Sequence, residues 1–169
     1  MTDRKLLIDE AQRQIAALRM TDTRITLLSL SAPNLPQSVV AALVRAASAP
    51  LDLVGELGDG TYGLLALHAR GPDGGAGVEH RFLLRLQGVL APLAARHNIG
   101  QVKFRAVHRW ACELTEWADL FDSLRDAPAI TLSIPPDYAN QPEAHRVSGM
   151  AAAFRFFRHT PAATDSSRT

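Results

Sequence analysis

The stretch that decides the fold is residues 51–69, LDLVGELGDGTYGLLALHA. Two apolar runs, Leu51–Leu57 and Thr61–Ala69, flank Gly58-Asp59-Gly60. An Asp-Gly pair between such runs is the strongest short-range signal for a β-hairpin, because both central residues of a type I′ turn need a positive φ. We therefore predict a hairpin, and we favour a turn role for Asp59 over ligation of a cation or a substrate hydroxyl.

Helices and strands are predicted on both sides of this hairpin. Apolar residues at three- and four-residue intervals predict helices over 3–18, 37–49, 78–98 and 114–124. Alternating or β-branched runs predict strands over 23–31 and 101–111. In order these elements give a helix, then β-α-β-β-α-β, then a helix. The predicted fold is α+β: a ferredoxin-like βαββαβ sheet with helices on one face, plus an N-terminal helix and a C-terminal extension.

The length of 169 residues, 47% of them hydrophobic, fits one main domain. We place an N-terminal amphipathic helix at 1–22, the ferredoxin-like domain at 23–128, a C-terminal extension at 129–160 and a disordered tail at 161–169. The extension holds one short strand candidate, Ile130–Ile134. If that segment joins the sheet, the exposed edge of the sheet changes.

The charges nearly cancel, with 18 Lys plus Arg against 17 Asp plus Glu and a formal net charge of +1. This balance gives no bulk electrostatic reason to expect nucleic acid or an anionic membrane as the main partner. The N-terminus lacks the apolar run of a signal peptide. No apolar stretch approaches the ~18 residues that span a bilayer. We expect a cytoplasmic protein without a transmembrane segment.

Cysteine and histidine offer little chemistry by spacing. A lone Cys112 cannot form an internal disulfide or a CxxC metal site, and the six histidines include no HExxH. His108 and Cys112 lie close enough to suggest a nucleophile pair, but such a pair also needs an orienting third group and an oxyanion site. We favour a structural His108 beside Trp110 and expect no metal.

The stretch from Asp52 to Leu65 resembles the segment of GGDEF domains, the bacterial diguanylate cyclases, that leads into and through their signature hairpin. Gly58-Asp59-Gly60-Thr61-Tyr62 occupies the place of the five-residue signature, and Tyr62 replaces its Phe. Leu64-Leu65 continue the second hairpin strand. The order of elements over residues 25–124 is also similar to a trimmed version of that fold. The resemblance implies a bacterial signalling domain.

The residues that this family uses for catalysis are replaced here. Gly60 and Thr61 stand where the signature has Asp and Glu, and Ser29-Leu30-Ser31 stands where a first-strand Asp helps to hold magnesium. Mg²⁺ needs such oxygen ligands beside a triphosphate. Ala49-Pro50-Leu51-Asp52 replaces the inhibitory Arg-x-x-Asp, which keeps the carboxylate and loses the guanidinium. The resemblance therefore implies a degenerate GGDEF domain without a metal or a cofactor.

We predict a non-catalytic regulatory or scaffolding domain that acts through a protein partner or self-association, and not an enzyme. The alternative from another class is a residual nucleotide sensor for GTP or cyclic di-GMP. Its ligand contacts would come from the two carboxylates and the hairpin backbone: Asp52, Gly58, Asp59 and Gly60.

An aromatic and basic segment near the C-terminus, MAAAFRFFRH at 150–159, is a candidate partner surface. Aromatic residues and Arg are enriched at protein interfaces and at anionic membrane surfaces. Plain packing of these rings on the sheet carries equal weight. The candidate contact residues are Phe154, Arg155, Phe157 and Arg158.

A basic row on the strand over 101–111 is a second candidate surface, made of Lys103, Arg105 and Arg109. An RNA-recognition module of the same βαββαβ order binds RNA on an open sheet face. Such a module stacks bases on aromatic rings of its central strands, and residues 64–67 here are Leu and Ala. We therefore favour a solvated face, or one that meets acidic groups of a partner, over RNA binding.

Overall fold

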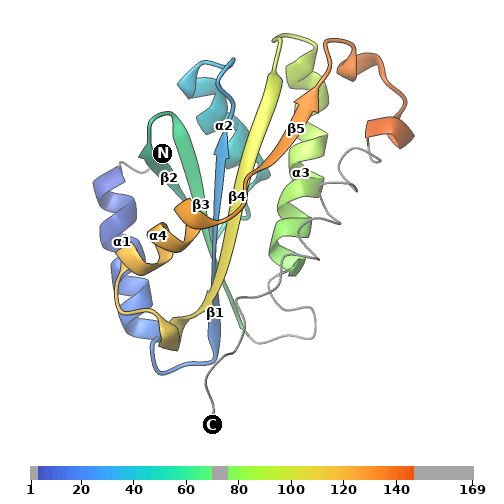
Figure 1. Ribbon diagram of the computed structural model, residues 1–169. Helices are drawn as coiled ribbons and strands as arrows, with labels where there is room; N and C mark the ends of the chain where they lie inside the picture. Colours follow the sequence, from blue (N-terminus) through green and yellow to red (C-terminus); the bar gives the residue numbers. More distant parts are fainter. Residues whose placement is uncertain (1–3, 70–75, 147–169) are drawn as a thin grey trace.

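The computed structural model describes residues 4–69 and 76–146, and Figure 1 shows how their helices and strands are arranged. The elements follow in the predicted order, with a strand added at the end, and form an α+β fold. Their bounds are α1 (Arg4–Leu18), β1 (Thr23–Ser31), α2 (Gln37–Ala47), β2 (Leu53–Gly58), β3 (Thr61–Ala69), α3 (Ala76–Ala94), β4 (Gly100–Trp110), the 3₁₀ turn η1 (Ala111–Glu113), α4 (Trp117–Asp126), β5 (Ile130–Ile134) and the 3₁₀ turn η2 (Tyr138–Asn140).

The sheet has the strand order β2-β3-β1-β4-β5, and every neighbouring pair is antiparallel. The first strand, β1, lies at the centre and pairs with both β3 and β4. The last strand, β5, pairs with β4 from Gly100↔Ile134 to Phe104↔Ile130. The strand candidate in the C-terminal extension therefore belongs to the sheet. This corrects the predicted domain end at residue 128 and makes β5 one edge.

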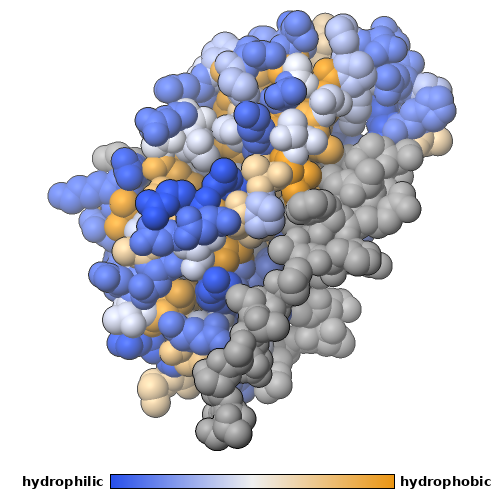
Figure 2. Space-filling view, viewed as in Figure 1, coloured by the Kyte–Doolittle hydropathy of each residue, from blue (hydrophilic) through white to orange (hydrophobic). Residues whose placement is uncertain are grey.

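Helices cover both faces of the sheet. One core lies under α2 and α3, as the βαββαβ pattern predicts, and the other lies under α1 and α4. The prediction from the sequence placed helices on only one face of the sheet, so the helices on the second face are a correction. Apolar stripes on α1 and α4 need burial, and they meet on this face through Leu7, Ile15, Trp117 and Leu120. Hydrophilic residues dominate the surface over α1 and α4, with apolar patches between them (Figure 2).

The hairpin turn matches the prediction from its sequence. Asp59 and Gly60, between β2 and β3, have φ values of 51° and 69°. Positive φ at both central positions is the type I′ pattern that joins twisted strands. The turn role of Asp59 is confirmed.

The helix predicted over 114–124 begins later, at Trp117, and ends at Asp126. Its start is fixed by Asp119, whose Oδ2 accepts hydrogen bonds from the backbone N–H groups of Thr115 and Glu116 at 2.9 and 3.0 Å. These two bonds hold the pKa of Asp119 below its ordinary value. The residues before Trp117 are therefore used as a cap rather than as a first helical turn.

Candidate functional site

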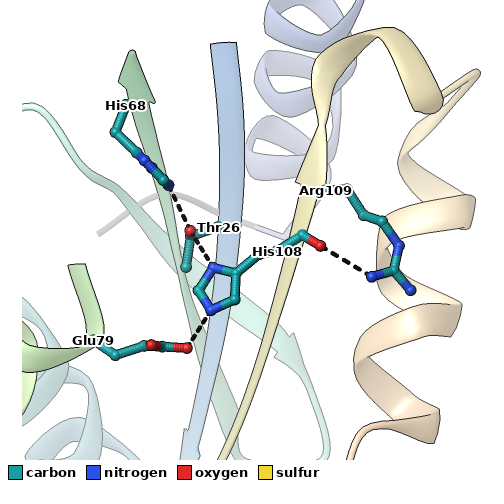
Figure 3. Close-up of polar contacts among 5 residues, drawn as sticks. All are labelled: Thr26, His68, Glu79, His108 and Arg109. Atoms are coloured by element: carbon teal, nitrogen blue, oxygen red, sulfur yellow. Dashed lines mark hydrogen bonds and ion pairs between the residues drawn. The ribbon is translucent and has the colours of Figure 1, made fainter. Parts of the chain in front are cut away.

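Four polar side chains meet at one end of the sheet, on the face covered by α3 (Figure 3). Thr26 lies in β1, and His108 stands directly opposite it on β4. On β3, Ala66 stands opposite Thr26, and its side chain ends at Cβ. This leaves room for His68, two residues further on the same face, to reach Thr26 diagonally. Glu79 joins from the first turn of α3.

We call Thr26, His68, Glu79 and His108 the Thr26 cluster. Thr26 Oγ1 lies 2.7 Å from Nδ1 of His108 and 2.8 Å from Nε2 of His68. The second ring nitrogen of His108, Nε2, contacts Oε1 of Glu79. Thr26 is fully buried, and Glu79 is only 4% exposed. The four side chains form an unbroken hydrogen-bonded chain across three strands and one helix.

The electrostatics of the cluster keep His68 neutral. Burial lowers its pKa from 6.5 to about 4, and the charges of His108, Arg24 and Arg81 act in the same direction. Arg24 lies next to this end of the cluster, with its guanidinium 4.8 Å from the centre of the Trp110 ring. The neutral imidazole of His68 can both donate and accept a hydrogen bond.

A pocket of about 440 Å³ lies beside the cluster, between the α2–β2 turn, β3 and α3. We call it the Asp52 pocket. Its floor is apolar, and three charged side chains, those of Asp52, Arg81 and Arg85, lie around it. The residues that line it are Ala49, Pro50, Leu51, Asp52, Leu64, Ala66, Leu67, Val78, Arg81, Phe82 and Arg85.

Asp52 holds the turn that forms one wall of this pocket. Its Oδ2 accepts the backbone N–H of Ala49 at 2.6 Å, and its own N–H donates to the carbonyl oxygen of Ala49 at 3.1 Å. Partial burial raises the pKa of Asp52, while the bond from Ala49 and the charges of Arg85 and Arg81 lower it. The sequence singled out Asp52, and the structure places it in a pocket.

Arg81 and Arg85 lie one turn apart on α3, on the opposite wall of the pocket. Both are exposed. In the part of the chain that the structure describes, neither forms an ion pair with a carboxylate within 4.0 Å. Two guanidinium groups are thus available to an anion at this wall.

The predicted ligand residues do not form one site. Asp52 precedes β2, whereas Gly58, Asp59 and Gly60 lie at the opposite end of that strand. The three turn residues are outside the pocket lining. This corrects the grouping of Asp52 with the hairpin turn. The strand between them is six residues long, about 20 Å at ~3.3 Å per residue, which is too far for both carboxylates to meet one nucleotide.

The basic row on β4 is not an open face. Nη1 of Arg105 donates to the carbonyl oxygen of Arg125 in α4. Nη2 of Arg109 lies 3.3 Å from the Ser123 hydroxyl, and Nη1 donates to the carbonyl oxygen of His108 at 2.9 Å. Lys103 alone is exposed. Because α4 lies over this face, the predicted solvated row and the RNA surface are both corrected for Arg105 and Arg109.

The candidate partner residues Phe154, Arg155, Phe157 and Arg158 lie outside the described residues, as does the predicted tail. Cys112 is exposed and belongs to η1, whereas His108 bonds to Thr26 and Glu79. The nucleophile pair considered from the sequence therefore gives way to a different role for His108.

Sequence reasoning missed five residues of the two adjoining sites: Thr26, His68, Glu79, Arg81 and Arg85. Thr26 is 42 residues from His68 and 82 from His108, so only the strand register brings them together. The sequence held one sign that His108 takes part in a buried polar site. The alternation of β4 places His108 on the apolar side, where a polar side chain needs a buried partner.

Within residues 4–69 and 76–146, no group of three or more His, Cys, Asp or Glu side chains is arranged to hold a metal ion. The helices of the same ranges include none with the length and apolar character needed to cross a membrane. Comparison with known proteins adds no assignment: neither a protein-family model nor a curated protein matches this sequence.

Proposed function

We propose that this protein is a non-catalytic regulatory domain that binds a small organic anion in the Asp52 pocket. The observation that carries the proposal is the pair of exposed guanidinium groups, Arg81 and Arg85, on one wall of an apolar-floored pocket. A pocket of this size is in the range that holds a small ligand. Apolar surface with a few convergent polar groups is the usual chemistry of such sites.

The three charged groups define which ligand fits. The two guanidinium groups can grip a phosphate or a carboxylate, since the planar fork matches the spacing of two anionic oxygens. Pro50 and Leu51, both exposed, offer apolar surface for a ring. Asp52 uses Oδ2 for the Ala49 N–H, which leaves Oδ1 to accept a hydrogen bond from the ligand.

A purine nucleotide has all three features: a charged phosphate, a planar ring and N–H donors. The resemblance to GGDEF domains supports GTP and cyclic di-GMP as the first ligands to test. A ligand that touches both walls would fix the spacing between α3 and the turn at Asp52. A protein partner or a second copy of the chain would bind differently to the protein with this spacing fixed, and that difference in binding is the proposed regulation.

The experiment is a thermal-shift series with GTP, cyclic di-GMP, GMP and inorganic phosphate, each with and without magnesium. A ligand that binds only the folded state adds about 2.7 kcal/mol at a hundred times its Kd, which raises Tm visibly. We expect a nucleotide to raise Tm and inorganic phosphate to do so weakly or not at all, because phosphate leaves the apolar floor empty.

Variants test whether the pocket is the site. Arg81→Ala combined with Arg85→Ala should abolish the shift. Arg96→Ala serves as the matched control, because Arg96 is an exposed arginine just beyond α3 and outside the pocket lining. A shift that survives in the double variant, or the absence of any shift across the panel, would contradict the proposal and favour a protein-binding scaffold.

A further inference from the structure

The Thr26 cluster has one hydroxyl proton for two neighbouring ring nitrogens. Thr26 Oγ1 is within hydrogen-bond distance of both Nε2 of His68 and Nδ1 of His108. A hydroxyl donates one hydrogen bond at a time. When Thr26 donates to one ring, the other ring must carry a proton on the nitrogen that faces Thr26 and donate it to Oγ1. The proton positions on the two histidines are therefore locked to each other.

Two arrangements satisfy every contact while the His68 ring is neutral and Glu79 is a carboxylate. In the first, Nε2 of His68 donates to Thr26, Thr26 donates to Nδ1 of His108, and the neutral His108 ring donates from Nε2 to the Glu79 carboxylate. In the second, His108 carries protons on both nitrogens and donates to Thr26 and Glu79. Thr26 then donates to Nε2 of His68, so the neutral His68 ring carries its proton on Nδ1. The second arrangement holds one proton more than the first.

We propose that the Thr26 cluster is a proton-linked switch, which carries the protonation state of the His108–Glu79 pair across the sheet to His68, the residue that follows Leu67 of the Asp52 pocket. A proton enters at Nδ1 of His68, and the proton on Nε2 of the same ring passes to Thr26. The original hydroxyl proton of Thr26 passes to Nδ1 of His108. One proton is taken up, and no heavy-atom bond forms or breaks.

The surrounding charges determine where the added charge rests. On the His68 side, the positive charges of Arg24 of β1 and Arg81 of α3 both disfavour a positive charge on the His68 ring. On the His108 side, the nearly buried Glu79 carboxylate of α3 contacts Nε2 directly. On β4, Arg109 points away from the cluster toward α4 (Figure 3). The positive charge therefore rests on His108, and His68 changes its tautomer while staying neutral.

Burial also favours a neutral His68 and a positive charge on His108. The ring of His68 keeps its neutral form because its pKa is lowered to about 4. The carboxylate of Glu79 is nearly buried, where an adjacent imidazolium is its best partner.

The Asp52 pocket and the Thr26 cluster are connected through β3 and through Arg81. Ala66 lines the pocket and is two residues before His68 on the same strand face, and Arg81 acts electrostatically on both Asp52 and His68. A proton added to the cluster should therefore favour an anion in the pocket. This consequence rests on the proposed function, whereas the coupling between the two rings does not.

The test measures the ring nitrogens without any ligand. Histidine ring ¹⁵N spectra of the full chain, from about pH 8 to about pH 5, report which nitrogen of each ring carries a proton. His68→Gln and His108→Gln variants assign the two rings. We expect Nδ1 and Nε2 of His68 to exchange roles at the same pH midpoint at which His108 becomes protonated. Thr26→Ser, which keeps the hydroxyl, should preserve this shared midpoint.

Thr26→Val, which has the same shape without the hydroxyl, should leave His68 in one tautomer through the whole titration. If His68 still exchanges its tautomer with His108 in this variant, or never exchanges it in the natural chain, the switch is disproved. Glu79→Gln decides independently of how well the valine variant folds. It removes the carboxylate that faces Nε2 of His108, and the ring-nitrogen changes of His68 and His108 should still occur together; a separation of the two changes contradicts the coupling. Failure of the nucleotide thermal shift would leave these results unaffected.

Discussion

Two neighbouring residues of β4, His108 and Arg109, show how the two faces of one sheet treat polar side chains differently. His108 points toward α3, where Glu79 and Thr26 meet both of its ring nitrogens. Arg109 points toward α4, where it contacts the Ser123 hydroxyl, and it also donates to the carbonyl oxygen of His108 in its own strand. Both residues are polar and adjacent in sequence, but only one becomes part of a buried network with a carboxylate.

The helix that covers each face makes the difference. The first turn of α3 contributes a nearly buried glutamate, while α4 offers Arg105 and Arg109 only backbone and hydroxyl oxygens near its C-terminus. Carbonyl oxygens at a helix C-terminus attract cations without requiring burial. The α3 face should therefore lose more stability than the α4 face when its polar contacts are removed.

The largest effect is expected from Glu79→Ala. This change leaves Nε2 of His108 without its partner and opens a space at a site that is 4% exposed. Loss of a hydrogen bond to a charged, buried group costs about 2 kcal/mol. Urea unfolding should show this loss, whereas Glu143→Ala, at an exposed position, should leave the unfolding free energy within about 0.5 kcal/mol. Equal losses in the two variants would contradict the role of Glu79.

An intermediate effect is expected from pH. The pKa of His68 is 6.5 in an exposed chain and about 4 in the fold, so the unfolded state binds more protons between these values. The contribution of the neutral His68 ring to the free energy of unfolding is complete above pH 6.5 and is lost as pH falls toward 4. Partial exposure reduces the size of this loss. Tm should therefore fall less steeply below pH 6.5 in His68→Gln than in the natural chain.

The control for this titration is His145→Gln, because His145 is an exposed histidine outside the cluster. Its Tm should follow the same pH dependence as the natural chain. A His68→Gln protein that loses Tm as steeply as the control would show that another group, and not His68, causes the acid sensitivity.

The smallest effect is expected on the α4 face, from Arg105→Ala. Its guanidinium bonds to the Arg125 carbonyl oxygen near the surface, where water can replace it. We expect a loss below about 1 kcal/mol in urea unfolding. Arg105→Lys, which keeps the charge and a donor, should lose still less. A loss as large as that of Glu79→Ala would remove the distinction between the two faces.

Local patterns predicted much of this molecule, and long-range register supplied the rest. The Asp59-Gly60 turn and the alternation of β4 follow from neighbouring residues, so they could be predicted. The meeting of Thr26 with His68 and His108 depends on how β1 pairs with two distant strands, which no local pattern specifies. Asp52 was singled out from the sequence, but Arg81 and Arg85 join it only because α3 packs beside the α2–β2 turn.

The hydrogen bond between α1 and α4 has a consequence for dynamics. The backbone N–H of Trp117, in the first turn of α4, has no acceptor within its own helix and donates instead to Oε1 of Gln12 at 2.7 Å. Protection of this amide against solvent exchange therefore depends on α1 staying docked. A single amide proton reports the free energy of detaching the N-terminal helix, separately from global unfolding.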